Sequence, residues 1–187
     1  MKLDEPLIRL FDYPTGDILA ALPDADSPLW DVDQSRQKTY PVHRLTRSII
    51  FDWLDNAWEI GGPVNVKRYD YVPAALAGPV YACADRLQRH YGGKLVRMTL
   101  AELRARAKIP GHVDNGVGVT AVHRCHIPIV SNEQVKFYID RVPYYLEPNV
   151  AYEFDNTRAH AVENLSDQRR VHLLCDFMPA ELVAAAA

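Results

Sequence analysis

The second half of the chain alternates apolar and polar residues with a period of two, the spacing of a β-strand that buries one face. Short sequences rich in Asn, Asp, Ser and Pro separate these segments and are typical of turns. The predicted strands cover residues 94–100, 107–113, 119–130, 133–139, 150–155, 158–165 and 169–177. Such a succession of short strands predicts a β-sandwich or barrel.

Before these strands the pattern is helical or weak. Residues 73–91 begin with a proline, repeat apolar residues at helical spacing and end at Gly92-Gly93, so they predict one amphipathic helix with a glycine C-cap. A short helix is expected near 18–22 and a strand at 43–53. Because the helical region precedes the strands and does not alternate with them, a parallel doubly wound sheet is disfavoured. We expect a mainly β fold, a jelly roll with N-terminal helices packed on it.

Length and composition predict one domain over residues 1–187, since 48% of the residues are hydrophobic and can form a sizeable core. Within it, residues 1–93 are expected to form an N-terminal helical and substrate-side region, and 94–178 the β core. The 21 basic and 24 acidic residues give a net charge of -3, which offers no general electrostatic reason to expect a nucleic acid or an anionic membrane as partner.

The start of the chain has no apolar run of signal-peptide length, and no segment approaches a membrane span, so we expect a cytoplasmic protein. Cys83, Cys125 and Cys175 are an odd number without CxxC spacing, which favours reduced thiols. The sequence does not indicate the oligomeric state.

The sequence PGHVDNG places His112 and Asp114 two residues apart. On an extended segment their side chains leave the same face, and Gly111 and Gly116 would let them converge on one point. This pair could supply two metal ligands. The alternative is an exposed turn in which Asp114 makes an Asx-type hydrogen bond.

A third ligand would have to come from elsewhere, and His160, at the start of a downstream strand, is the strongest candidate. Two imidazoles and one carboxylate on one side of a metal leave coordination positions open, as in non-haem Fe(II) oxygenases. His123, His126 and His172 are rivals, and spacing alone does not decide among them.

Two basic positions suggest a site for an acidic molecule. If strands 158–165 and 169–177 form a hairpin, Arg170 shares a face with His160, and its planar fork could bind a carboxylate bidentately. Arg124 and His126 share a face of an apolar strand, where the alternative is a pair of edge residues reaching solvent. Asn156 or Asn164 is expected to be a hydrogen-bond partner near His160.

Together the sequences HVD, RCHIPI, YEFDNTRAHAVEN and RRVHLLCD resemble the aspartyl/asparaginyl β-hydroxylase family of Fe(II)- and 2-oxoglutarate-dependent dioxygenases, over roughly residues 94 to 178. The resemblance implies a double-stranded β-helix in which the iron ligands are His112, Asp114 and His160. It also implies that Arg170 binds the distal carboxylate of 2-oxoglutarate, and that the RxH pair, Arg124 and His126, helps to hold this cosubstrate.

The implied activity uses Fe(II), 2-oxoglutarate and O2 to hydroxylate an unactivated C–H of an amino acid, of an Asp or Asn residue in a peptide, or of a related small molecule. One alternative is a cupin-like metalloenzyme without 2-oxoglutarate, although it would not need the arginines. Another is a non-catalytic jelly roll that binds a small acid or a peptide. Substrate choice is expected in the first ninety residues, where aromatic and polar side chains gather: Trp30, Trp53, Trp58, Asn65, Lys67, Arg68, Tyr69 and Tyr71. At least two of the tryptophans are expected in the core.

Overall fold

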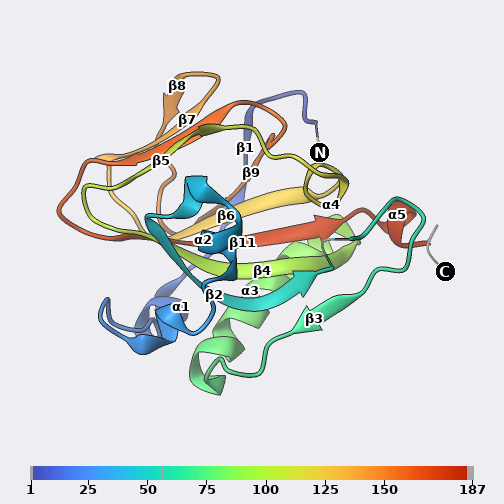
Figure 1. The fold of residues 1–187 in the computed structure, drawn as a ribbon, viewed down its shortest axis with the longest axis horizontal. Coiled ribbons are helices and arrows are strands. Elements are labelled where there is room, and N and C mark those ends of the chain that lie inside the picture. The colour runs from blue at the N-terminus through green and yellow to red at the C-terminus, as the bar shows by residue number, and fades with distance from the viewer. Residues whose placement is uncertain (1, 56, 185–187) are drawn as a thin grey trace.

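Two antiparallel sheets face each other in the computed structural model, which describes residues 2–55 and 57–184 (Figure 1). The larger sheet contains, in spatial order, β1 (Leu7–Asp12), β9 (Val150–Phe154), β6 (His123–Val130), β11 (Arg170–Met178), β4 (Lys94–Leu103), β2 (Thr46–Leu54) and β3 (Val66–Arg68). The smaller sheet contains β5 (Lys108–His112), β10 (His160–Asn164), β7 (Val135–Ile139) and β8 (Val142–Tyr144). This is a double-stranded β-helix, and it confirms the predicted mainly β fold class.

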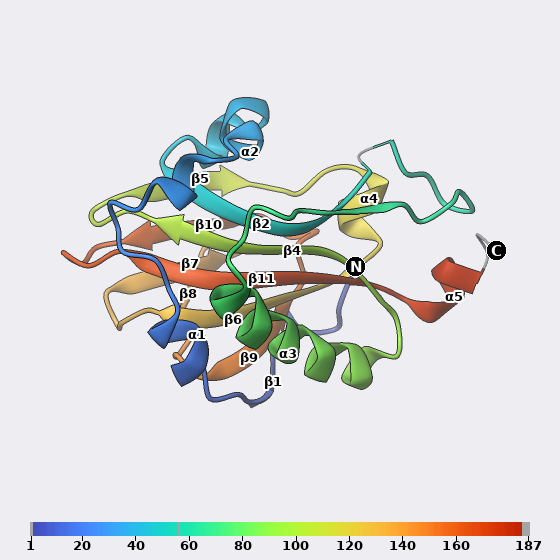
Figure 2. The same cartoon turned by 90° about the horizontal axis from the view of Figure 1, so that it is seen from below.

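Helix α3 (Ala74–Tyr91) lies along the outer face of the larger sheet, with α1 (Gly16–Ala20) beside it (Figure 2). The predicted apolar stripe of α3 is the buried one, and the helix continues through Pro79. Gly92 ends it with φ 64°, a left-handed conformation that glycine adopts without steric cost. The stripe packs on the sheet through Leu76, Val80, Cys83, Ala84 and Leu87.

Strand alternation gives the larger sheet one apolar face and one polar face. The residues of β11 that face α3 are apolar: Val171, Leu173, Cys175 and Phe177. The alternate positions, which face the smaller sheet, include Arg170, His172 and Asp176, all buried. Burying such groups costs free energy unless they find partners, so a polar interior marks this inner face as the place of function.

The predicted hairpin between the last two strands is wrong. Strand β10 pairs with β5 and β7 in the smaller sheet, whereas β11 lies between β4 and β6 in the larger one. The chain crosses from one sheet to the other in a turn held by Asn164, whose amide donates to the carbonyls of Arg104 and Gln168. His160 and Arg170 therefore do not share a face of one sheet. They reach the interior from opposite sheets.

The first 93 residues contribute strands as well as helices, because β1, β2 and β3 all join the larger sheet. Between α1 and β2 the chain forms three further short helical segments: η1 (Pro28–Asp31), α2 (Ser35–Thr39) and η2 (Pro41–His43). A short helix, α4 (Val117–Thr120), overlaps the start of the strand predicted from residue 119, and α5 (Ala180–Ala184) follows β11.

Segment η2 contacts β5, so the N-terminal part of the chain covers the open side of the interior, where Figure 2 shows α2 on the side opposite α3.

All three cysteines are buried and free, as expected. In the described part of the chain, no helix is long and apolar enough to cross a membrane.

Candidate metal centre

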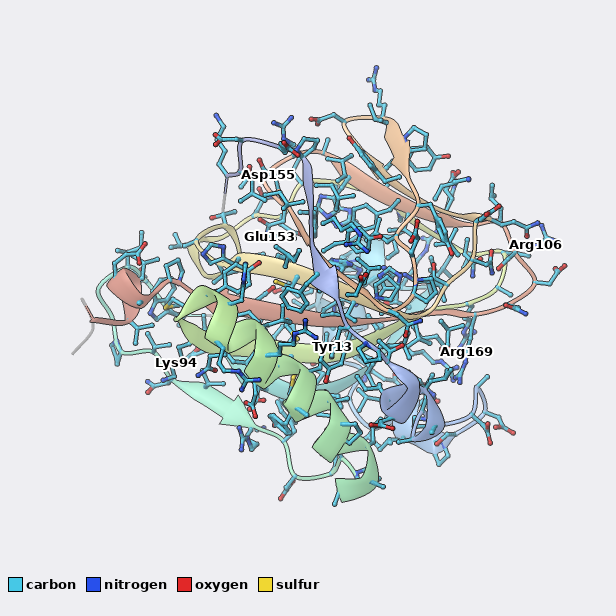
Figure 3. All side chains as sticks on the ribbon, turned by 180° about the vertical axis from the view of Figure 1, so that it is seen from behind. Tyr13, Lys94, Arg106, Glu153, Asp155 and Arg169 are labelled. Atoms are coloured by element: carbon cyan, nitrogen blue, oxygen red, sulfur yellow. The ribbon has the colours of Figure 1, made fainter. Side chains whose placement is uncertain are left out.

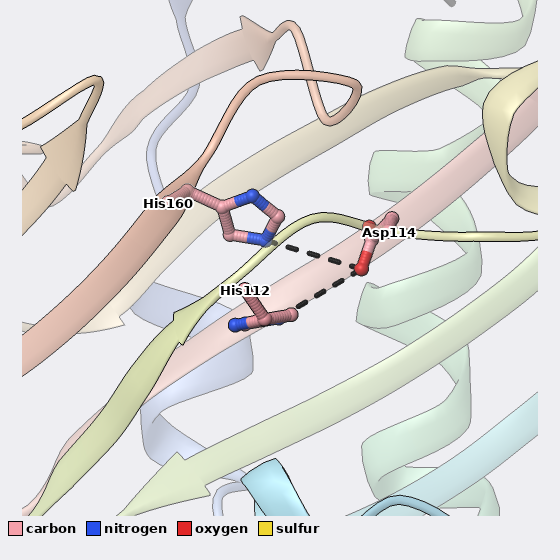
Figure 4. Close-up of side chains that lie close together, drawn as sticks. All are labelled: His112, Asp114 and His160. Atoms are coloured by element: carbon pink, nitrogen blue, oxygen red, sulfur yellow. Dashed lines mark ion pairs between the residues drawn. The ribbon is translucent and has the colours of Figure 1, made fainter.

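His112, Asp114 and His160 converge at one end of the interior (Figure 4). His112 ends β5, and His160, which begins β10, is its partner in the antiparallel pairing. Asp114 follows β5 by two residues. One ligand atom from each side chain lies within 4.8 Å of the others. None of the three rival histidines belongs to this group.

Backbone carbonyls orient both imidazoles. His112 Nδ1 lies 2.8 Å from the carbonyl oxygen of Pro110, and His160 Nδ1 lies 2.9 Å from that of Arg158. A carbonyl only accepts, so each Nδ1 carries a proton, and in the neutral ring Nε2 is then the nitrogen with the lone pair. Burial lowers the pKa of His160, which also favours the neutral ring. Both rings are therefore prepared to coordinate a metal through Nε2.

The two oxygens of Asp114 have different surroundings. Oδ2 accepts hydrogen bonds from Arg124 and from Asn156, the latter at 3.3 Å. Oδ1 faces the imidazoles, 3.8 Å from His112 Nε2 and 3.9 Å from His160 Nε2. Burial, the largest single effect, would raise the pKa of Asp114, but Arg124, the two histidines and the hydrogen bond from Asn156 together outweigh it, so the pKa is lowered. The carboxylate is therefore ionised, with one oxygen free for a cation.

This donor set fits a first-row transition metal. Three ligands at right angles, each about 2.1 Å from an ion, lie about 3 Å apart, so the observed spacing needs an inward shift of less than about 1 Å per atom. Two imidazole nitrogens and one carboxylate oxygen on one side of the ion match the set found in non-haem Fe(II) oxygenases and leave the other side open.

Asn156 supports the metal centre at Asp114 rather than at His160, where it was expected. Its side-chain amide donates to Asp114 Oδ2 and, over 2.9 Å, to the carbonyl of Val119, while its backbone carbonyl accepts from the Asp114 amide at 3.4 Å. Asn156 thus ties the loop after β5 to the turn before β10. Asn164 holds the crossing turn and does not reach His160.

Two cavities adjoin the metal-binding group and share part of their lining. An outer cavity of about 370 Å³ is lined by Tyr40, Trp53 and Val113, and a narrow inner one of about 50 Å³ reaches Phe137 and Arg170. Both are lined by Arg36, His43, His112, Asp114, Arg124 and Leu174. A molecule bound to the metal could therefore extend inward to Arg170 while another approaches from outside.

Arg170 is buried at the inner end of this space, with 2% of its surface exposed. Its Nη2 donates to His172 Nδ1 at 2.6 Å, and its Nε has no hydrogen-bond partner among the described residues. Burial and the charge of Arg36 lower the pKa of Arg170 to about 9, so the group is still cationic at neutral pH. No described carboxylate lies within ion-pair distance, so this is a buried cation prepared for an anionic ligand.

Arg124 and His126 both lie inside the barrel, so the alternative of edge residues reaching solvent is wrong. Arg124 binds Asp176 bidentately, at 2.9 and 2.7 Å, as well as Asp114. His126 lines the inner cavity and lies edge-on to Phe137 and Phe154. Arg124 positions the Asp114 carboxylate, whereas His126 forms part of the wall near Arg170.

The other two rivals lie elsewhere. His172 is behind Arg170 and 3.4 Å from His126, Nδ1 to Nδ1. His123 is on the face toward α3, where its Nδ1 lies 2.7 Å from Glu153, which also accepts from Tyr91. Figure 3 labels Glu153 close to α3. Neither is placed to bind a metal together with Asp114.

The residues expected to choose the substrate are dispersed. Trp53 lines the outer cavity, while Trp30 and Trp58 are core residues, as expected for two of the tryptophans. A second groove of about 990 Å³, between β3 and α3, is also lined by Trp53 and by four others: Asn65, Lys67, Arg68 and Tyr69. Sequence reasoning missed Arg36 and His43, which belong to no motif and reach the site because the chain passes over its mouth.

The model of the family described as aspartyl/asparaginyl beta-hydroxylase matches residues 80–179, which is more than half of the chain. No curated protein matches.

Solved structures of similar fold include a prolyl hydroxylase from Trichoplax adhaerens in complex with a hypoxia inducible factor peptide, with 12% identity and a TM-score of 0.57, covering 98% of this chain and 88% of that one. The viral collagen prolyl hydroxylase of Paramecium Bursaria Chlorella virus-1 has 6% identity, a TM-score of 0.55 and coverage of 95% and 97%. A 2OG-Fe(II) oxygenase family oxidoreductase from Burkholderia pseudomallei has 14% identity, a TM-score of 0.54 and coverage of 91% and 93%. At such identities the likeness shows the fold.

Proposed function

The chain belongs to the aspartyl/asparaginyl β-hydroxylase family, and from this premise we propose that it is an Fe(II)- and 2-oxoglutarate-dependent hydroxylase acting on an unactivated C–H of an amino acid, of an Asp or Asn residue in a peptide, or of a related small molecule. One observation carries the proposal. The side chains of His112, Asp114 and His160 converge in a cavity that also reaches the buried guanidinium of Arg170. No carboxylate of the described residues pairs with Arg170.

In this proposal, His112 and His160 bind Fe(II) through Nε2, and Asp114 binds it through Oδ1. When bound, the iron and 2-oxoglutarate supply the oxidising power, because O2 gives one oxygen atom to succinate and one to the hydroxylated C–H while CO2 is released. Arg170 holds the distal carboxylate of 2-oxoglutarate in a bidentate pair. His126 is placed to help hold this cosubstrate in the inner cavity.

The protein supplies position and a dry environment. Arg124, fixed by Asp176, keeps Asp114 ionised and turned toward the imidazoles. Phe137 and Phe154, packed against each other with ring centroids 5.1 Å apart, close the inner wall. Exclusion of water there strengthens the electrostatic pairing at Arg170.

Anaerobic titration of the protein with Fe(II), with and without 2-oxoglutarate, tests this function. We expect a metal-to-ligand charge-transfer absorption band only when both are present. Binding of Fe(II) without such a band would instead indicate a metalloenzyme that does not chelate 2-oxoglutarate. Absence of metal binding would indicate a non-catalytic jelly roll.

A further inference from the structure

Arg36 brings a second guanidinium to the site from outside the matched family region. It lies in α2, near the N-terminal end of the chain, yet it lines both the outer and the inner cavity. Its Nη2 donates to His43 Nε2 at 3.0 Å and its Nη1 to Thr46 Oγ1 at 3.5 Å. The acceptors are an imidazole nitrogen and a hydroxyl, so neither neutralises its charge.

The charges around the cavities leave Arg36 without a counter-ion. Arg97, Arg124, Arg170 and Arg36 all line this space, whereas the carboxylates that line it are Asp114 and Asp176. Arg124 pairs with both aspartates, and Arg97 lies 3.5 Å from Asp176. Within the described residues, Arg36 and Arg170 have no carboxylate at ion-pair distance.

Two anionic ligands would balance these two cations. In the proposed function, one carboxylate of 2-oxoglutarate lies at the metal and the other at Arg170, so this cosubstrate is fully accounted for without Arg36. Arg36, unlike Arg170, also faces the outer cavity, from which the substrate must approach. The outer cavity is lined by this guanidinium and by apolar and aromatic side chains, including Val42, Trp53 and Val113.

Resting on the proposed function, we propose that Arg36 binds a carboxylate of the substrate, and that the substrate is a small carboxylic acid such as a free amino acid. The volume of about 370 Å³ is near the lower end for a small-molecule site and suits a compact ligand better than a folded polypeptide. The carboxylate would be held at Arg36, the hydrocarbon part would pack on the apolar wall, and the reacting C–H would point toward the metal centre.

The test measures binding by calorimetry, without oxygen, on the full chain loaded with Zn(II) and 2-oxoglutarate. The probes are the free L-amino acids and the same compounds as carboxamides. In the wild type we expect at least one acid to bind about 10- to 100-fold more tightly than its amide, the value of a charge-assisted hydrogen bond. Arg36→Gln should remove this preference, Arg36→Lys should keep part of it, and Arg44→Gln, an exposed change in the same segment, should keep all of it.

Three results would overturn the proposal. One is that no free acid binds at millimolar concentration, or that acids and amides bind equally. A second is that a blocked peptide with an internal Asp binds and the free acids do not. The third is that Arg36→Gln weakens 2-oxoglutarate binding as much as Arg170→Gln does, since Arg36 would then serve the cosubstrate. Failure of the proposed function is distinguishable, because the charge-transfer band would then be absent from the wild type itself.

Discussion

His112 and His160 are cross-strand partners in the smaller sheet, with ring centroids 4.3 Å apart. Directly opposed residues of an antiparallel pair carry side chains on the same face, so the register of β5 and β10 brings the two Nε2 atoms to the same side. A shift of one residue would turn His160 away from His112. The pairing of these strands, rather than a local motif, therefore creates the metal-binding group.

Replacing His160 with alanine should remove one of three metal ligands. We expect Fe(II) affinity to fall by at least about 100-fold, since even the loss of an outer hydrogen-bond partner costs about 10- to 100-fold. Anaerobic titration monitored by the 2-oxoglutarate charge-transfer band measures this. His90→Ala, on the exposed end of α3, is the matched control, and an unaltered band in His160→Ala would refute the assignment of this ligand.

Arg170→Gln should weaken 2-oxoglutarate binding on the order of 100-fold, because a buried bidentate charge-assisted pair is lost. His172 acts through Arg170, so His172→Ala should weaken 2-oxoglutarate binding less, by about 3- to 10-fold. In a protein that already carries Arg170→Gln, the same substitution should weaken this binding hardly any further. Calorimetry on the four proteins loaded with Zn(II) gives the double-mutant cycle, and Arg106→Gln on the surface is the control. If the effects of the two substitutions on 2-oxoglutarate affinity were fully additive, His172 would not act through Arg170.

Asn156→Ala should release the loop that carries Asp114. The side chain is fully buried and bonds both Asp114 and the Val119 carbonyl, so we expect a loss of about 1–3 kcal/mol in unfolding free energy and about 10- to 100-fold in metal affinity. Urea unfolding and metal titration measure the two effects. Asn115→Ala, exposed in the same loop, should change neither, and wild-type metal affinity in Asn156→Ala would argue against this role.

Much of the fold follows from local pattern. Residues 94–178 alternate with a period of two, and each predicted strand there corresponds to an observed one. The apolar stripe of α3 and its glycine cap were also readable, because helix burial and termination depend on nearby residues. Strand pairing was not readable. The segment after β10 is short enough for a hairpin, but both strands pair with segments distant in sequence, and a turn alone does not reveal this.

The functional site also contains some residues that could be predicted from the sequence and others that could not. His112 and Asp114 were recognisable because their spacing is local, and Arg170 because a motif places it after His160. Arg36 and His43 had no such signal, since they enter the cavities only after β2 joins β4 and the preceding segment folds over the mouth. Asn156 was expected at His160 and instead holds Asp114, because the loop after β5 lies against the turn that contains it.

Acid should destabilise the protein before its carboxylates titrate. Burial, with the charge of Arg170 added to it, holds the pKa values of His126 and His172 well below the usual value of about 6.5. The unfolded chain binds protons at these histidines below about pH 6.5 and the folded chain does not, so stability rises with pH up to about 6.5 and then levels off. The lowered pKa values of His43 and His160 act in the same direction.

The free energy of unfolding of the metal-free protein, measured in urea, should therefore be lower at about pH 5.5 than at about pH 7.5, by on the order of 1 kcal/mol for each of His126 and His172. A smaller pH dependence is expected in His172→Asn, because this variant has lost one of the two histidines that take up a proton on unfolding. His90→Asn should keep the wild-type dependence, since that side chain is exposed. Equal wild-type stability at the two pH values would mean that the interior accepts protonated imidazoles, which the proximity of Arg170 to His172 argues against.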